Sequence, residues 1–120
     1  MCTPVLSFGD YIVTFEAQEE EISARRHFVK ECGWSESDFA KIENFDWFCA
    51  AVRLFKYGNE IDCEYLGCCC YKTEQEFYTR YKGDYFADMV HTLAENSKDA
   101  VLLDDVKAWR ESLCETVTAQ

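Results

Sequence analysis

Residues 45–71 read FDWFCAAVRLFKYGNEIDCEYLGCCCY, and this stretch gives the clearest structural signal in the chain. Two runs rich in aromatic and aliphatic residues, a composition typical of strands, flank the dipeptide Gly58-Asn59. Glycine at the first central position suits a two-residue turn of type I′ or II′, which joins antiparallel strands. The stretch therefore predicts a β-hairpin over Phe45–Tyr71.

A turn at Gly58-Asn59 also predicts the register of the hairpin, because it pairs residues whose numbers sum to 117. Arg53 then lies directly opposite Glu64, which makes a favourable pair of opposite charges. One face of the hairpin is apolar and needs helices over it, whereas the other becomes charged toward the turn. The residues expected to be buried together on the apolar face include Phe48, Val52, Tyr65 and Cys69.

The chain before the hairpin predicts one strand and two helices. Residues Val5–Phe15 are rich in β-branched and aromatic types and predict a strand, with a turn or bulge at Gly9-Asp10. Residues Gln18–Cys32 predict a helix, because three glutamates near its start suit the positive end of the helix dipole. The Ser-x-x-Asp spacing of Ser35 and Asp38 predicts the N-terminus of a second, short helix.

The chain after the hairpin predicts helices. A capping-box pattern at Thr73–Glu76 opens a helical segment that is expected to run through Tyr81. Asp84 is the expected N-cap of the next helix, and an apolar stripe over Leu102–Leu113 predicts the last one. The end of the chain, Glu115–Gln120, is expected to fray.

These elements predict an α+β fold in the order β-α-α-β-β-α-α. The hairpin forms the centre of a small antiparallel sheet, the N-terminal strand joins it, and the helices cover one face. A length of 120 residues corresponds to a single domain over residues 1–120.

The charge balance is the sequence feature that bears most on function. Asp and Glu number 23 against 12 Lys and Arg, a formal net charge of −11. A field of this sign repels phosphate backbones and anionic membranes, and it attracts proteins whose surfaces grip nucleic acid. We therefore expect a basic nucleic-acid-binding protein or nucleoprotein complex as partner, and no direct contact with nucleic acid or membrane. The alternative explanation is that the acidity serves solubility alone.

Two acidic clusters are the candidate partner-binding residues. Each is expected at the start of a predicted helix, on an exposed face. If they bind no partner, these carboxylates serve only to stabilise the helix through its dipole, by about 0.3–1 kcal/mol each. The candidates are Glu19, Glu20, Glu21, Asp104 and Asp105.

The chain contains eight cysteines but no C-x-x-C pair. The usual zinc spacing is missing, and the thiols are expected to be reduced and to pack as small core hydrophobes. Neighbours on a strand point to opposite faces, so the run Cys68-Cys69-Cys70 cannot converge on one metal ion. The alternative function is a cytosolic thiol protein that binds metal or acts in redox through Cys49, Cys68 and Cys70.

No pattern of catalytic residues is visible in the sequence. Both histidines, His27 and His91, lie on predicted helices away from the cysteines in sequence, and the five glycines are scattered rather than gathered into a phosphate loop. The N-terminus lacks the pattern of a signal peptide, and no apolar run approaches about 20 residues. We expect a non-enzymatic, cytoplasmic protein without cofactor, catalytic residues or metal, as a monomer or small homo-oligomer.

Four segments resemble parts of small, mostly uncharacterised proteins carried by bacterial phages and plasmids. They are Ala24–Phe28, Glu31–Ser35, Tyr65–Tyr71 and Asp84–Val90, about a fifth of the chain. Some small acidic α+β proteins of such elements are anti-CRISPR or anti-restriction inhibitors. The resemblance implies a bacterial host cytoplasm and an inhibitor that binds a defence nucleoprotein complex, including Cas effector subunits. Such an inhibitor would block the complex's nucleic-acid-binding surface.

Overall fold

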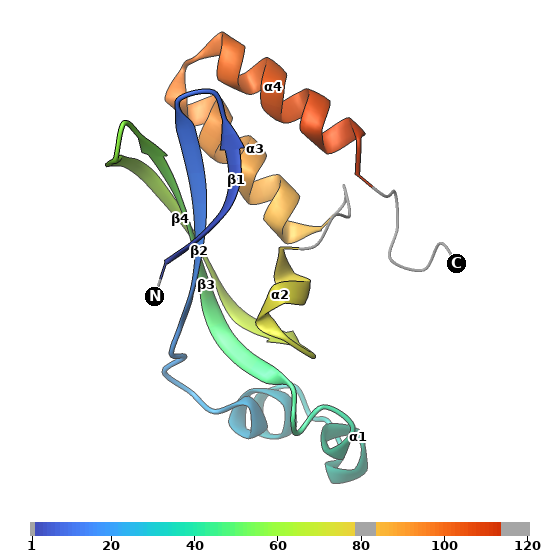
Figure 1. The fold of residues 1–120 in the computed structure, drawn as a ribbon. Helices are drawn as coiled ribbons and strands as arrows, with labels where there is room; N and C mark the ends of the chain where they lie inside the picture. The colour runs from blue at the N-terminus through green and yellow to red at the C-terminus, as the bar shows by residue number, and fades with distance from the viewer. Residues whose placement is uncertain (1, 79–83, 114–120) are drawn as a thin grey trace.

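The computed structural model describes residues 2–78 and 84–113. Four strands form one antiparallel sheet in the order β1-β2-β3-β4, so strands that are neighbours in sequence are also neighbours in the sheet. The strands are β1 (Thr3–Phe8), β2 (Tyr11–Gln18), β3 (Asp46–Lys56) and β4 (Asn59–Tyr71). The α+β class, the antiparallel sheet and the β3–β4 hairpin are as expected from the sequence, but β4 is an edge strand and only the helices after it cover a face of the sheet (Figure 1).

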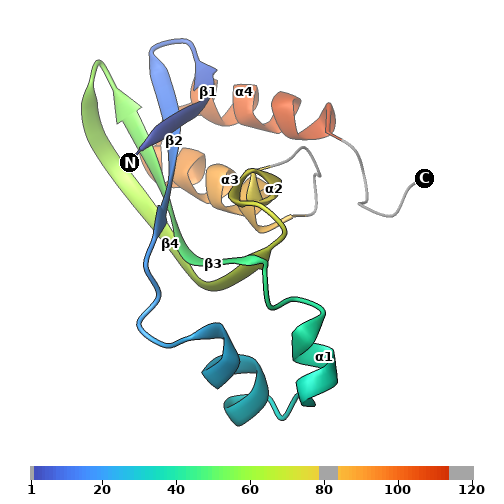
Figure 2. The same cartoon turned by 60° about the horizontal axis from the view of Figure 1, so that its bottom comes forward.

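Two helical segments connect β2 to β3 and three follow β4. The connection contains a π-helix, η1 (Arg26–Glu31), and α1 (Glu36–Ala40), which lie beyond one end of the sheet (Figure 2). The helices α2 (Glu74–Phe77), α3 (Tyr85–Ser97) and α4 (Ala100–Glu111) pack on one face of the sheet. In the described parts of the chain, no helix has the length and apolar character that a bilayer span requires.

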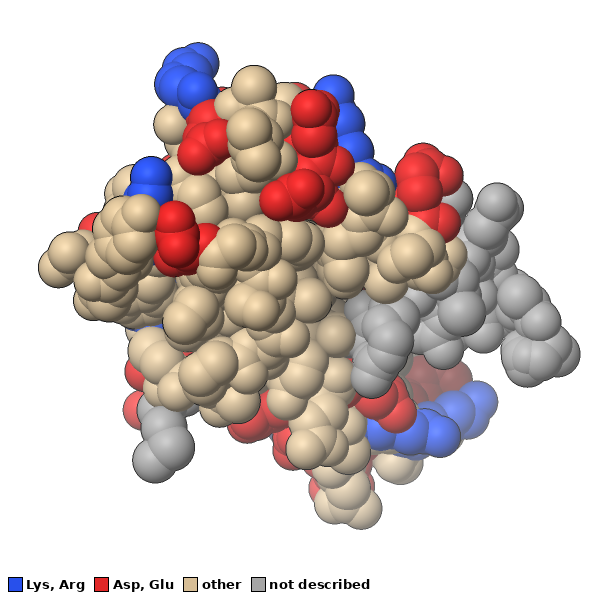
Figure 3. Space-filling view, turned by 45° about the horizontal axis from the view of Figure 1, so that its top comes forward, with Lys and Arg blue, Asp and Glu red and all other residues tan. Residues whose placement is uncertain are grey.

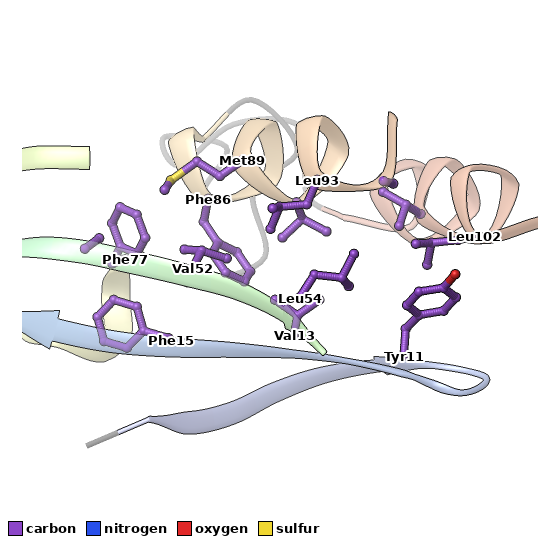
Figure 4. Close-up of a cluster of buried hydrophobic side chains, with 14 of the residues drawn as sticks. Tyr11, Val13, Phe15, Val52, Leu54, Phe77, Phe86, Met89, Leu93 and Leu102 are labelled. Carbon is purple, nitrogen blue, oxygen red and sulfur yellow. The ribbon is translucent and has the colours of Figure 1, made fainter. Parts of the chain in front are cut away.

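The core lies between this face of the sheet and the helices (Figure 4). Val13, Val52 and Leu54 point from the strands toward Phe86 and Leu93 of α3, and each of these side chains is at most 2% exposed. The last helix is tied to the sheet by a polar contact as well, since the Tyr11 hydroxyl donates to Asp99 Oδ2 at 2.7 Å. Asp99 is also the N-cap of α4: its Oδ1 accepts from the backbone N–H groups of residues 101 and 102.

The predicted strand Val5–Phe15 is in fact two strands. Gly9 has a φ of +59°, a left-handed conformation that glycine adopts readily, and the chain reverses there to form a second hairpin. β1 is therefore a separate edge strand of the sheet, whereas the sequence predicted β1 and the start of β2 as one strand.

The predicted helix over Gln18–Cys32 is correct only in its second half, where residues 24–31 are helical. Residues up to Gln18 belong to β2 and pair with β3 as far as Cys49, so the sheet ladder takes up the start of the predicted helix. The glutamates that follow lie in the connection, and η1 begins only at Arg26. At Gln18, pairing with β3 overrides the local helix preference. The predicted cap at Ser35 is confirmed, because its hydroxyl accepts from the Asp38 N–H at 3.1 Å.

The predicted register of the main hairpin is correct only at the end far from the turn. Phe48 lies opposite Cys69 as expected, but the two residues at the tip of the turn are Tyr57 and Gly58, whose φ values are +52° and +82°. Positive φ at both positions is the pattern of a type I′ turn. Two bulges, each with one extra residue in β4, then restore the predicted register at Phe48.

These bulges decide which side chains share a face. Arg53 lies opposite Cys63 instead of Glu64, and Glu64 lies opposite Val52. Tyr65, predicted to be buried, is 59% exposed, whereas Phe48, Val52 and Cys69 are buried as predicted. The later helices begin where the sequence indicates, after Thr73 and after Asp84. The predictions at Tyr81 and at Glu115–Gln120 lie outside the described residues.

Candidate functional site

The helices occupy one face of the sheet, and the candidate site lies on the opposite face, which we call the open face. Its residues come from the three longer strands. They are Ile12, Thr14 and Glu16 of β2, Ala51, Arg53 and Phe55 of β3, and Cys63 and Tyr65 of β4. Ile12 and Tyr65 are 42% and 59% exposed, so large apolar and aromatic surface faces outward here. An antiparallel sheet commonly keeps one such face toward solvent.

Arg53 lies at the centre of the open face and joins the strands through ion pairs. Its Nη1 lies 2.5 Å from Glu16 Oε1, and its Nε lies 3.4 Å from Glu60 Oε1. The hydrogen bond from Arg53 lowers the pKa of Glu16 and raises the pKa of the guanidinium. The Arg53 side chain is only 14% exposed, so this charge is used within the sheet and is not presented to a partner.

A hollow of about 290 Å³ lies beside Arg53, at the end of the open face that carries the two turns. We call it the turn-end hollow, and its lining includes Pro4, Asp10, Ile12, Thr14, Phe55 and Tyr57. The Tyr57 hydroxyl donates to Asp10 Oδ2 at 2.8 Å, and this bond raises the pKa of Tyr57. Thr14 is 6% exposed, and its hydroxyl has no hydrogen-bond partner among the described residues.

The other end of the sheet carries a cluster of aromatic and thiol side chains around His27. The ring of His27 lies 5.3 Å from that of Trp47, whose Nε1–H donates to the Ile22 carbonyl at 2.8 Å. The two ring nitrogens of His27 face different thiols: Nε2 lies 3.8 Å from Cys32 Sγ, and Nδ1 lies 3.8 Å from Cys68 Sγ. His27 is distant from Cys68 in sequence, and the fold brings the two side chains together.

The geometry of this cluster does not favour a reactive thiolate. Desolvation, followed by the charges of Glu20 and Glu31, raises the pKa of the Cys68 thiol. A thiol needs a lowered pKa to act as a nucleophile near neutral pH. Within residues 2–78 and 84–113, no group of three or more His, Cys, Asp or Glu side chains is arranged to hold a metal ion.

The expectation that the cysteines pack in the core is correct for only one of the described ones. Cys69 is 3% exposed, whereas the others are exposed or half-buried. A β-bulge breaks the alternation of the strand, and Cys68 adopts a φ of +57° there. The exposed thiols are those of Cys2, Cys32 and Cys68, and the half-buried ones are those of Cys49, Cys63 and Cys70.

The two acidic clusters predicted as partner-binding residues lie far apart in the structure. Glu19, Glu20 and Glu21 lie in the connection after β2, and Asp104 and Asp105 lie on α4, toward the opposite end of the molecule (Figure 1). Neither cluster is at a helix start: η1 begins at residue 26, and the first turn of α4 has no acidic residue. The two clusters therefore cannot form one continuous surface.

Within the first cluster, Glu20 has a structural role. Its carboxylate accepts the backbone N–H of Cys68, and a Cβ at Gly67 would lie 3.0 Å from it. Glu20 thus holds the β4 bulge, while Glu19, Glu21, Asp104 and Asp105 are exposed. Figure 3 shows acidic side chains beside a broad uncharged area on the face turned to the reader.

Both edges of the sheet are built against the addition of another strand. On β1 the edge is short and is interrupted by Pro4 and a shift of register next to it. On β4, Asp62 and Glu64 lie on the same side as Leu54 and Val52, so charges point inward at this edge. Proline, bulges and inward charges are devices that prevent edge-to-edge pairing. A partner would accordingly contact side chains on the surface rather than extend the sheet.

Comparison with known proteins yields no match: no protein-family model matches the chain, and no curated protein or solved structure is significantly similar to it.

Proposed function

We propose that this chain is a non-enzymatic, acidic inhibitor that docks on the basic, nucleic-acid-binding surface of a partner complex and blocks it. The partner class implied by the sequence resemblance is a bacterial defence complex of the CRISPR-Cas kind, in the host cytoplasm. One observation carries the proposal: Glu19, Glu21, Asp104 and Asp105 are exposed and form no ion pair with another described residue.

The basic side chains support the same reading, because many of them are already paired. Arg26 Nε lies 3.7 Å from Glu31, Lys41 Nζ lies 3.6 Å from Asp38, and Arg53 is held by two glutamates. Arg25 and Arg110 also form ion pairs, with Glu36 and Asp88. These pairs are nearly neutral at a distance, so the surplus carboxylates determine the long-range field.

Such a field acts on a nucleic-acid-binding surface in a direct way. The basic residues that bind phosphates are attracted to exposed carboxylates, and the inhibitor and the nucleic acid then compete for the same groups. The attraction weakens with salt, since the Debye length falls from about 10 Å at 0.1 M to about 3 Å at 1 M. The inhibitor needs no enzymatic step and no cofactor to act in this way.

The test measures how well the purified chain displaces target DNA from purified CRISPR effector complexes, at two salt concentrations. One variant carries Glu19→Lys and Glu21→Lys, and a second carries Asp104→Lys and Asp105→Lys. Glu20 is left unchanged because it supports the β4 bulge. A third variant, Glu43→Lys with Glu74→Lys, is the matched control, since both residues are exposed and the change in net charge is the same.

We expect one of the two cluster variants to weaken inhibition about tenfold or more, while its thermal midpoint stays close to that of the wild type. The control should change inhibition only slightly, and high salt should reduce the difference. Equal inhibition by all three variants, unaffected by salt, would show that the acidity serves solubility. Simultaneous binding of chain and DNA would contradict competition.

The alternative function, metal binding or redox through Cys49, Cys68 and Cys70, retains one supporting observation. Cys68 has an unusual backbone conformation, is exposed and lies beside His27, with Cys32 on the other side of the ring. Non-glycine residues in the left-handed region are more frequent at functional sites than elsewhere. Elemental analysis of protein purified under reducing conditions decides the metal part. Less than one equivalent of zinc or iron supports the inhibitor, whereas stoichiometric metal that is lost in Cys68→Ser supports the alternative.

A further inference from the structure

We propose that a hollow on η1 binds the phosphate group of a phosphate monoester, held by three basic side chains and one serine hydroxyl. The hollow has a volume of about 450 Å³, and we call it the η1 hollow. Its lining consists of Ser23, Arg25, Arg26, Lys30 and Glu31. This inference goes beyond the proposed function, which depends on acidic residues elsewhere on the surface.

The winding of η1 gathers the cations on one side of the helical segment. The Cys32 N–H donates to the carbonyl of His27, five residues earlier, at 3.0 Å, which is the hydrogen-bond spacing of a π-helix. This wide turn brings residues five apart close together, so Arg25 and Lys30 line the same hollow. In an α-helix, with 3.6 residues per turn, these two side chains would point about 140° apart. Turns of the π type are rare, and they often occur at functional sites.

Arg25 is held in place before a ligand binds. Its Nη1 pairs with the Glu36 carboxylate, and its Cζ lies 4.9 Å from the centroid of the buried Phe39 ring. Ring and carboxylate together fix the guanidinium. Only Nη1 is used, since neither Nε nor Nη2 donates to another described residue. These donors can therefore bind a ligand, and a side chain that is already ordered loses less entropy on binding.

The other polar groups of the hollow also keep donors for a ligand. Ser23 Oγ accepts the backbone N–H of Arg26 at 3.1 Å, which leaves the hydroxyl hydrogen to donate. The Nε of Arg26 lies 3.7 Å from Glu31 Oε2, too far for a hydrogen bond. Lys30 forms no ion pair with another described residue. The three terminal oxygens of a phosphate monoester are strong acceptors and match this set of donors.

The charges around the hollow are complementary to a dianion. Three cations face one lining carboxylate, that of Glu31, and the sum stays positive when Glu36 is counted as well. A phosphate monoester carries about −1.5 to −2 charges at pH 7. The acidic residues elsewhere on the chain repel an anion less at 0.15 M salt, where the Debye length is about 8 Å.

The size of the hollow favours an ester over free phosphate. Sites for organic ligands begin at about 300 Å³, so about 450 Å³ leaves room for a group attached to the phosphate. The aliphatic stems of Arg26 and Lys30 supply apolar walls for that group. A phosphorylated side chain of a protein and a small metabolite such as a nucleotide share this chemistry.

The experiment is an NMR titration of the isotope-labelled chain at 0.15 M salt, with four probes at millimolar concentration. Uridine monophosphate represents the metabolite, N-acetyl-phosphoserine amide represents the protein side chain, and dimethyl phosphate and uridine are the controls. We expect both monoesters to shift the resonances of residues 23–31 and to bind about tenfold more tightly than dimethyl phosphate, which carries a single charge. Uridine should not bind, and the tighter monoester identifies the source of the phosphate.

Three variants test the residues of the hollow. Lys30→Gln should weaken the binding of both monoesters about tenfold, because a charged donor is lost. Glu31→Gln should strengthen it about threefold, because a like charge is removed, and a purely structural role of Glu31 would not produce this gain. Lys107→Gln is the matched control: Lys107 is exposed on α4, outside the hollow, and the change in net charge equals that of Lys30→Gln. Melting curves confirm that the variants are folded.

The proposal is overturned if dimethyl phosphate binds as tightly as the monoesters, if the shifts map to another part of the chain, or if no probe shifts any resonance. It is also overturned if Lys107→Gln weakens binding as much as Lys30→Gln. Each of these results leaves the proposed function intact, because displacement of DNA is measured with other variants. Conversely, charge-reversal variants that inhibit normally reject the acidic docking and leave the η1 hollow intact.

Discussion

At the scale of single residues, Thr14 and Arg53 show how the open face differs from an ordinary solvated strand surface. Arg53 is shielded from solvent and paired with Glu16 and Glu60. Thr14, directly beside it in the sheet, is buried, and its hydroxyl has no hydrogen-bond partner among the described residues. A valine would fill the same volume, and it is a strong strand former. The hydroxyl therefore lowers the stability of the chain.

We predict that Thr14→Val stabilises the chain by about 1–2 kcal/mol, because it removes a buried unpaired polar group without leaving a cavity. The free energy of unfolding in urea measures the effect. Thr14→Ser is the matched control: it keeps the hydroxyl and removes the methyl group, so it should not stabilise. If Thr14→Val is no more stable than the wild type, the hydroxyl is paired in solution.

At the scale of the elements, β4 is the strand that departs most from regular geometry. It contains two bulges, it is an edge strand, and Cys68 has a left-handed backbone within the bulge that Glu20 holds. The left-handed conformation costs a residue with a Cβ roughly 1–2 kcal/mol, whereas glycine adopts it freely. The bulge thus strains the backbone of Cys68, whose thiol is exposed. It also directs the side chain of the next residue, Cys69, into the core.

We predict that Cys68→Gly stabilises the chain by about 1 kcal/mol, since the strain at φ +57° disappears. Cys70→Gly is the control, because Cys70 pairs with Trp47 in the regular part of the strand and glycine destabilises a strand interior. Denaturation in urea under reducing conditions compares the two. A loss of stability in Cys68→Gly would mean that the contact between its thiol and His27 outweighs the strain.

At the scale of the whole molecule, packing desolvates two titratable groups, the buried Cys69 and the half-buried Tyr71, and this favours their protonated forms. Burial raises the pKa of Cys69 from 9.0 to about 12 and that of Tyr71 from 10.0 to about 12. When a folded-state pKa lies above the unfolded one, the stabilisation is complete below the unfolded value and is lost as the pH rises through the folded value. Stability should therefore decline progressively between pH 9 and pH 12.

We predict a thermal midpoint that falls as the pH rises above 9, measured under reducing conditions. Cys69→Ala should be less stable than the wild type at pH 7, because it leaves a small cavity, but its midpoint should fall less steeply above pH 9. Identical slopes for the two proteins would show that Cys69 does not titrate in this range.

The features that depend on local signals could be predicted from the sequence. Hydrophobic alternation and a glycine between two strand-forming runs specify the central hairpin, and short polar caps such as Ser35 specify helix starts. The buried positions of Phe48, Val52 and Cys69 followed from the same pattern. These signals depend on neighbours within a few residues, so they can be recognised without knowing the rest of the fold.

The tertiary structure alone decided the register, the fate of the predicted first helix and the candidate site. Tyr57 and Cys68 adopt positive φ, which sequence preferences for non-glycine residues argue against, and the two bulges of β4 place Arg53 beside Cys63. Glu16 and Thr14 meet β3 only because β2 pairs with it across the intervening η1 and α1. The free energy of these arrangements comes from ladder pairing and packing between distant segments, and local preferences are too small to oppose it.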